Sequence, residues 1–132
     1  MSASKPAAPV RALAILMGVI IGSILAYAYQ TNLPTLFYEM NVATLVVFVA
    51  IPLLAGFIVG LLHPAMAFKN GVYAGLLIGL FNSIVAAVKL IFATQVLKAG
   101  DVYAFSMFAI MAVFVWTILA AVAAVLAAKF YD

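Results

Sequence analysis

The chain has 132 residues, of which 70% are hydrophobic and 7% are charged. Ordinary soluble domains contain about 25% charged residues, so this chain has too few to cover a surface that faces water. We therefore expect an integral membrane protein with a single transmembrane domain. The six basic residues, with a net charge of +3, are too few and too scattered for a nucleic-acid groove. Cysteine is absent, which excludes disulfides, thiolate nucleophiles and cysteine metal sites.

Four long apolar runs follow a polar N-terminal tail, residues 1–10. They predict transmembrane helices at about 12–29, 43–62, 71–95 and 103–130, because about 20 apolar residues span a bilayer. The first run has the basic start and small residues of a signal peptide, but its length of about 18 residues favours a helix that is retained. The expected fold is all-α, an integral membrane four-helix bundle with short loops.

The basic residues outside the apolar runs predict the orientation of the bundle. Four spans place both termini on one side of the membrane. With that side in the cytosol, four basic residues are cytosolic (Lys5, Arg11, Lys69 and Lys129). Lys98 is then outside with Glu39 and Asp101. The positive-inside rule favours this arrangement, so we expect a multi-pass protein of the cell membrane with both termini in the cytoplasm.

Small residues recur at spacings of four within the apolar runs. These spacings predict a helix-packing seam, because glycine and alanine let helix backbones approach closely in a membrane. The first run contributes Gly18 and Gly22, the second Gly56 and Gly60, and the third Gly71, Gly75 and Gly79; the fourth carries alanines instead, as at Ala120, Ala124 and Ala128.

The third run places two polar residues, Asn82 and Lys89, on the same stripe as its glycines. A charge inside a membrane marks an ion, proton or substrate path in many proteins. Alternatively, Lys89 snorkels to the interface or pairs with Glu39 or Asp101. Asn82 lies nearer the bilayer centre, where it is expected to make an interhelical hydrogen bond. These two residues form a possible intramembrane polar site.

The chain contains few residues that could carry out enzyme chemistry. The three acidic residues, Glu39, Asp101 and Asp132, all fall in connections or at the C-terminus. Asp132 is predicted on the opposite side of the membrane from the other two. His63 is the only histidine, whereas a metal site needs three or four ligands. We therefore expect no catalytic residues, no metal site, no cofactor and no enzyme activity.

The central hairpin, residues 51–85, combines a Gly-x-x-x-Gly helix, a short loop and the pattern Asn-Gly-x-x-x-Gly-x-x-x-Gly. This pattern resembles small four-helix membrane proteins that are found mainly in archaea and have no assigned function. The resemblance covers about a quarter of the chain. It implies the same four-span architecture and no catalytic residues.

Two functions are compatible with these features. The first is a non-catalytic accessory or scaffold subunit of a larger membrane complex, whose glycine seams serve packing. The alternative is a small oligomeric transporter or channel, with Lys89 and Asn82 near its pathway. The expected partners are the lipid bilayer and either other membrane protein subunits or further copies of this chain, with no nucleic acid.

Overall fold

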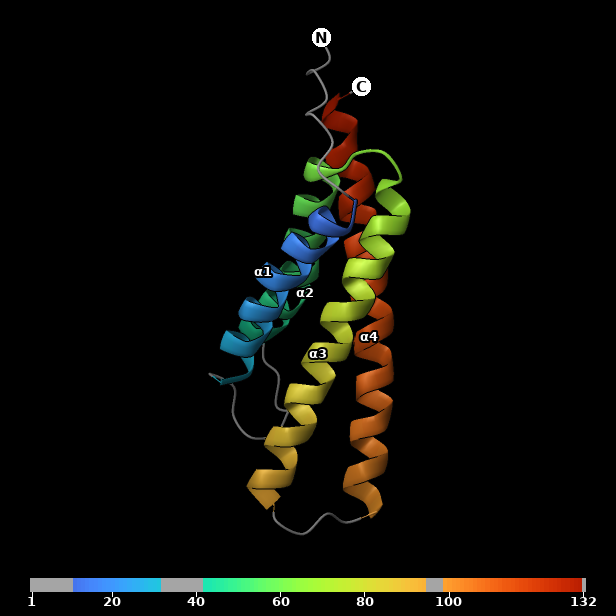
Figure 1. Ribbon diagram of the computed structural model, residues 1–132. Helices are drawn as coiled ribbons and strands as arrows, with labels where there is room; N and C mark the ends of the chain where they lie inside the picture. The colour runs from blue at the N-terminus through green and yellow to red at the C-terminus, as the bar shows by residue number, and fades with distance from the viewer. Residues whose placement is uncertain (1–10, 32–41, 95–98, 132) are drawn as a thin grey trace.

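A computed structural model describes residues 11–31, 42–94 and 99–131 of the chain, and these residues are almost entirely helical (Figure 1). The four α-helices are α1 (Arg11–Thr31), α2 (Val42–Leu62), α3 (Ala67–Thr94) and α4 (Ala99–Ala128), and the short 3-10 helix η1 (Lys129–Tyr131) follows α4. The all-α prediction is confirmed, and each of the four helices is long and apolar enough to cross a membrane. The expected polar tail 1–10 and parts of the two longer connections lie outside the described residues.

The connection between α2 and α3 is shorter than expected, because α3 begins at Ala67 rather than Gly71. Met66 adopts a left-handed backbone conformation, with φ of 60°, which turns the chain out of the connection. The backbone N–H of Asn70 then donates to the carbonyl of Met66 at 3.0 Å. Asn70, whose polarity predicts a loop residue, is fully buried in the first turn of α3. Its side chain is satisfied by hydrogen bonds within the fold, so the helix can begin early.

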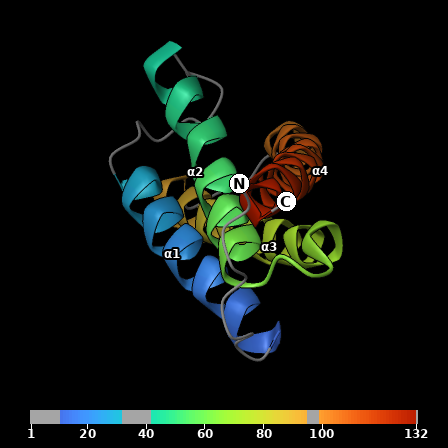
Figure 2. The same ribbon diagram turned by 90° about the horizontal axis from the view of Figure 1, so that it is seen from above.

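The helices alternate in direction, so that α1 and α3 are parallel to each other and antiparallel to α2 and α4 (Figure 1). α4 packs most extensively against α3 and α2, and α1 packs against the other sides of α2 and α3. The view along the bundle shows α1 and α4 on its two sides, with α2 and α3 between them (Figure 2). The lower parts of α3 and α4 extend past the ends of α1 and α2 (Figure 1).

α2 and α4 pack with their backbones almost in contact. A Cβ atom on Gly56 would overlap the carbonyl oxygen of Ala120, and one on Gly60 would overlap that of Ala124. Both alanines are fully buried. Backbones approach this closely only where neither helix presents more than a methyl group.

The glycines of α3 also face α4. A Cβ on Gly71 would lie 2.7 Å from the Cα of Ala121, and one on Gly75 would lie 2.6 Å from the carbonyl oxygen of Trp116. Gly79 has more space, since its Cβ would lie 3.1 Å from the nearest atom, the Cα of Val113. The three glycines thus line the contact of α3 with α4.

The glycines of α1 serve a different contact. Gly18 lies against Val59 and Ala55 of α2, and Gly22 lies between Ala55 and Ile78 of α3. α1 therefore rests in the groove between α2 and α3. The glycines thus serve two sets of contacts, those of α2 and α3 with α4 and those of α1 with α2 and α3.

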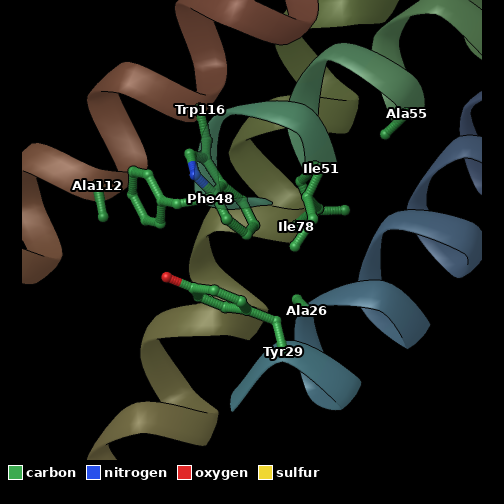
Figure 3. Packing of buried hydrophobic residues seen from close by; sticks show 8 residues of the cluster. All are labelled: Ala26, Tyr29, Phe48, Ile51, Ala55, Ile78, Ala112 and Trp116. Atoms are coloured by element: carbon green, nitrogen blue, oxygen red, sulfur yellow. The ribbon is translucent and has the colours of Figure 1, made fainter. Parts of the chain in front are cut away.

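A cluster of buried apolar side chains, three of them aromatic, fills the centre of the bundle. Trp116 is fully buried, and its ring lies 5.2 Å, centroid to centroid, from that of Phe48. Figure 3 shows Tyr29 of α1 extending toward these rings from the opposite side. The cluster comprises Ala26, Tyr29, Phe48, Ile51, Ala55, Ile78, Ala112 and Trp116, so all four helices contribute to it.

We expect Gly56→Ala to lower the free energy of unfolding by about 1–3 kcal/mol, because its methyl group forces α2 away from the α4 backbone. Gly79→Ala is the matched control. It makes the same change in helix propensity, but its nearest neighbour is 3.1 Å away and its cost is smaller. Unfolding in mild detergent with increasing dodecyl sulfate measures both. Equal losses for the two variants would contradict the close backbone contact.

Candidate functional site

The side-chain hydrogen bonds that join α1 to α3 belong to two clusters of polar residues. The distal cluster consists of Gln30, Asn82 and Lys89. The proximal cluster consists of Arg11, His63, Asn70 and Tyr73. The two clusters lie toward opposite ends of α1, because Arg11 begins that helix and Gln30 is next to its last residue.

In the distal cluster, one residue of α1 binds both polar residues predicted on α3. The side-chain amide of Gln30 donates a hydrogen bond to the Oδ1 of Asn82 at 2.9 Å. The Nζ of Lys89 donates to the backbone carbonyl of the same Gln30. Gln30 and Asn82 are 5% and 2% exposed, so their hydrogen bond is shielded from any surrounding solvent. The cluster therefore fastens the end of α1 to the side of α3.

Lys89 is well placed to stabilise the last turn of α1. The final carbonyl groups of a helix have no partner within the helix and carry the negative end of its dipole. A lysine ammonium that donates to one of these carbonyls satisfies it and complements the dipole. This contact gives Lys89 a structural role at the α1 terminus. The acidic side chains proposed as its partners, Glu39 and Asp101, lie outside the described side chains.

In the proximal cluster, Arg11 binds the first turn of α3. Its Nε donates to the Oδ1 of Asn70 at 2.5 Å, and its guanidinium lies 5.4 Å from the centroid of the Tyr73 ring. The amide nitrogen of Asn70 donates in turn to the carbonyl of Ala65 at 3.3 Å. His63 belongs to the same turn, with its Nδ1 2.7 Å from that carbonyl. The single histidine thus makes a local contact within the α2–α3 connection.

The two clusters hold α1 and α3 in one register. Arg11 and Asn70 are 59 residues apart in sequence, and so are Gln30 and Lys89. The two parallel helices therefore keep the same residue offset from one cluster to the other. A slip of one residue along either helix breaks the hydrogen bonds at both ends.

The stripe predicted on α3 is a single face of the helix, but it meets two different neighbours. Its first part, Gly71 to Gly79, lies against α4, whereas Asn82 and Lys89 bind α1. The partner changes because α1 and α4 incline differently to α3 along its length (Figure 1). The polar residues are consequently separated from the glycine contacts with α4.

Three residues of these clusters do not stand out in the sequence. Gln30 ends an apolar run, Asn70 adjoins a loop signal, and Arg11 begins a helix, so each has the polarity of a residue at a helix boundary. Their spacing could have indicated the pairing of α1 with α3, since Arg11 to Gln30 and Asn70 to Lys89 span the same number of residues. Among the described residues, no group of three histidine, aspartate or glutamate side chains converges as metal ligands do.

A double-mutant cycle on Gln30→Leu and Asn82→Leu tests the distal cluster. Each single change leaves a buried amide without its partner, so the double variant loses less stability than the sum of the two. We expect a coupling energy of about 0.6 kcal/mol, the average for interhelical hydrogen bonds in membranes. Unfolding in detergent provides the measurement.

Ser83→Ala combined with Gln30→Leu is the control cycle. Ser83 neighbours Asn82, but its hydroxyl donates to the carbonyl of Gly79 in its own helix at 2.9 Å. This control pair shares no hydrogen bond, so its effects should add and its coupling energy should be close to zero. Additivity in the Gln30–Asn82 cycle as well would refute the predicted coupling.

Comparison with known proteins identifies no relative for this chain: no protein-family model matches it, and no curated protein or solved structure is significantly similar to it.

Proposed function

We propose that the chain is a multi-pass membrane protein with both termini in the cytosol. Three basic residues support this orientation, since Arg11, Lys69 and Lys129 all belong to one end of the bundle. The hydrogen bond from Arg11 to Asn70 joins α1 to α3 there, and one from the Tyr131 hydroxyl to the carbonyl of Leu61 joins η1 to α2. The positive-inside rule places such an end in the cytosol.

The spacing of the two polar clusters supports a position in the bilayer. Arg11 and Gln30 are 19 residues apart in one helix. At 1.5 Å per residue they are separated by about 28 Å along α1, close to the hydrocarbon thickness of about 30 Å. The proximal cluster then lies at the cytoplasmic interface, and Gln30 and Lys89 of the distal cluster lie at the outer one. Lys89 is consequently placed at the boundary, where a charge is tolerated.

The end of the α3–α4 pair then projects beyond the outer boundary. α3 has 28 residues and a length of about 42 Å, more than the hydrocarbon requires. The residues after Lys89 in α3 and the first residues of α4 pass the ends of α1 and α2 (Figure 1). This projecting tip exposes large apolar side chains, namely Ile91, Phe92, Val102 and Tyr103.

The projecting apolar tip is the observation that carries our functional proposal. Outside the hydrocarbon, a cluster of exposed large apolar residues indicates an interaction site rather than a lipid-facing surface. We infer a non-catalytic accessory or scaffold subunit whose tip docks onto another subunit of a membrane assembly. The bundle beneath serves as a rigid anchor, because its helices are in close backbone contact.

Transport is the alternative, with Asn82 and Lys89 lining a path. The contacts of these residues favour the structural role over transport. Asn82 is paired with Gln30, and Lys89 binds a backbone carbonyl, so ion passage would require breaking the attachment of α1. The side chains of Asn82 and Lys89 therefore serve the pairing of α1 with α3.

We expect Phe92→Ala to reduce co-purification of partner subunits from native membranes in mild detergent by at least several-fold, because large aromatic residues anchor interfaces. Phe114→Ala is the matched control, since Phe92 is 79% exposed on the tip and Phe114 is 68% exposed within the span. The control variant should recover partners at the wild-type level. Solitary, monodisperse wild-type protein at native expression would refute the subunit proposal.

Lys89→Met separates the scaffold from the transporter. We expect faster amide hydrogen exchange in the last turn of α1, because the carbonyl of Gln30 loses its donor. Solute and ion flux into liposomes should equal that of the wild type and of protein-free liposomes. Wild-type flux that Lys89→Met abolishes, without a change in α1 exchange, would establish the transporter instead.

A further inference from the structure

An apolar groove runs along the outer side of the α1–α3 contact, below the proximal cluster. It has a volume of about 330 Å³ and is lined by Ala12, Ile15, Leu16 and Val19 of α1 and by Tyr73 and Leu77 of α3. Ligand sites commonly range from about 300 to 1,000 Å³. The lining residues follow helical spacings on two parallel helices, so the groove extends along the bundle axis as a lipid chain does.

A cationic group with unused donors stands at the head of this groove. Tyr73 lines the groove, and the guanidinium of Arg11 lies over its ring. A guanidinium has five N–H donors. Among the described residues, Arg11 donates one hydrogen bond, from Nε to Asn70, and its buried Nη2 has no partner. An unpaired charged donor that is withdrawn from water is costly unless an acceptor binds it.

The surrounding charge favours an anionic acceptor. Arg11 as a whole is only partly buried, so a ligand can approach the part of its guanidinium that stays exposed beside the buried Nη2. Lys69 is exposed in the first turn of α3, and Lys129 is exposed at the start of η1 at the same end of the bundle. α1 and α3 both begin here, so the positive ends of two helix dipoles point the same way. Phosphate oxygens match the planar fork of an arginine better than any neutral acceptor.

We propose that this groove binds one phospholipid, with its phosphate on the free donors of Arg11 and an acyl chain along α1 and α3. The proposal rests on the membrane insertion and orientation proposed above, which place the groove in the cytoplasmic leaflet. The bound lipid completes the hydrogen bonds of Arg11 and covers the α1–α3 contact. It thereby adds to the contacts at the proximal cluster, which holds α1 in register with α3.

Native mass spectrometry of the full chain in mild detergent, titrated with phosphatidylglycerol, tests the site. The wild type should retain one lipid per chain. Arg11→Gln should bind about tenfold more weakly, because it loses a charge-assisted hydrogen bond. Ala12→Phe should have a similar effect by filling the groove while it leaves Arg11 and Asn70 intact. Retention at the wild-type level in both variants would overturn the proposal.

Two controls identify the chemistry. Lys129→Gln removes an exposed charge at the same end of the bundle and should change binding less than twofold. Inorganic phosphate replaces the lipid in a second titration. If inorganic phosphate displaces the lipid and Ala12→Phe still binds lipid at the wild-type level, the groove does not hold the acyl chain. That result would assign the site to a free anion and overturn the lipid proposal. Where Arg11→Gln fails to fold, as judged by circular dichroism, Ala12→Phe alone decides.

Cysteine labelling separates this inference from the proposed topology. The chain contains no cysteine, so Lys5→Cys and Gly100→Cys each introduce one reactive thiol. An impermeant maleimide should label Gly100→Cys and spare Lys5→Cys in intact cells. The reverse labelling overturns the orientation and the cytoplasmic leaflet together. The expected labelling without an Arg11-dependent lipid overturns the lipid site alone.

Discussion

The close approach of helix backbones at glycine and alanine is the constraint on which the rest of this structure depends. Gly56 and Gly60 bring α2 against the carbonyls of Ala120 and Ala124. In the bilayer that we propose for this chain, apolar side chains gain little from leaving lipid, so van der Waals contact between backbones has to hold the helices together. Once α2, α3 and α4 are joined in this way, the faces of α2 and α3 that point away from α4 form the groove that receives α1.

α1 is attached in a different manner, which explains where the polar residues are found. It has two glycines at its contacts and adds hydrogen bonds near both of its ends, through Arg11 and Gln30. Small residues allow helices to slide, whereas a pair of directional bonds fixes one register. The polar residues Asn82 and Lys89, which in isolation suggest a pathway, contribute to that register in this fold.

The two ends of the bundle differ in chemistry and therefore in proposed role. One end carries Arg11, Lys69 and Lys129 above an apolar groove, a combination suited to a lipid phosphate and its chain. The other end extends beyond α1 and exposes Phe92 and Tyr103. Anionic lipid at one interface and a protein partner at the other are consistent with a passive anchor that is held at a defined depth.

The sequence by itself determined the all-α class, four long apolar helices and the small-residue spacings, because these depend on composition and on local periodicity. It also singled out Asn82 and Lys89 as unusual. Helix starts were less accurate, since the buried side-chain bonds of Asn70 let α3 begin four residues early. Only the tertiary structure decided that the α3 stripe meets α4 at its glycines and α1 at its polar residues. A helical period specifies which residues share a face, whereas the crossing of neighbouring helices decides what that face touches. The bonds of Gln30 and Arg11 depend on the same crossing, because each joins residues far apart in the chain.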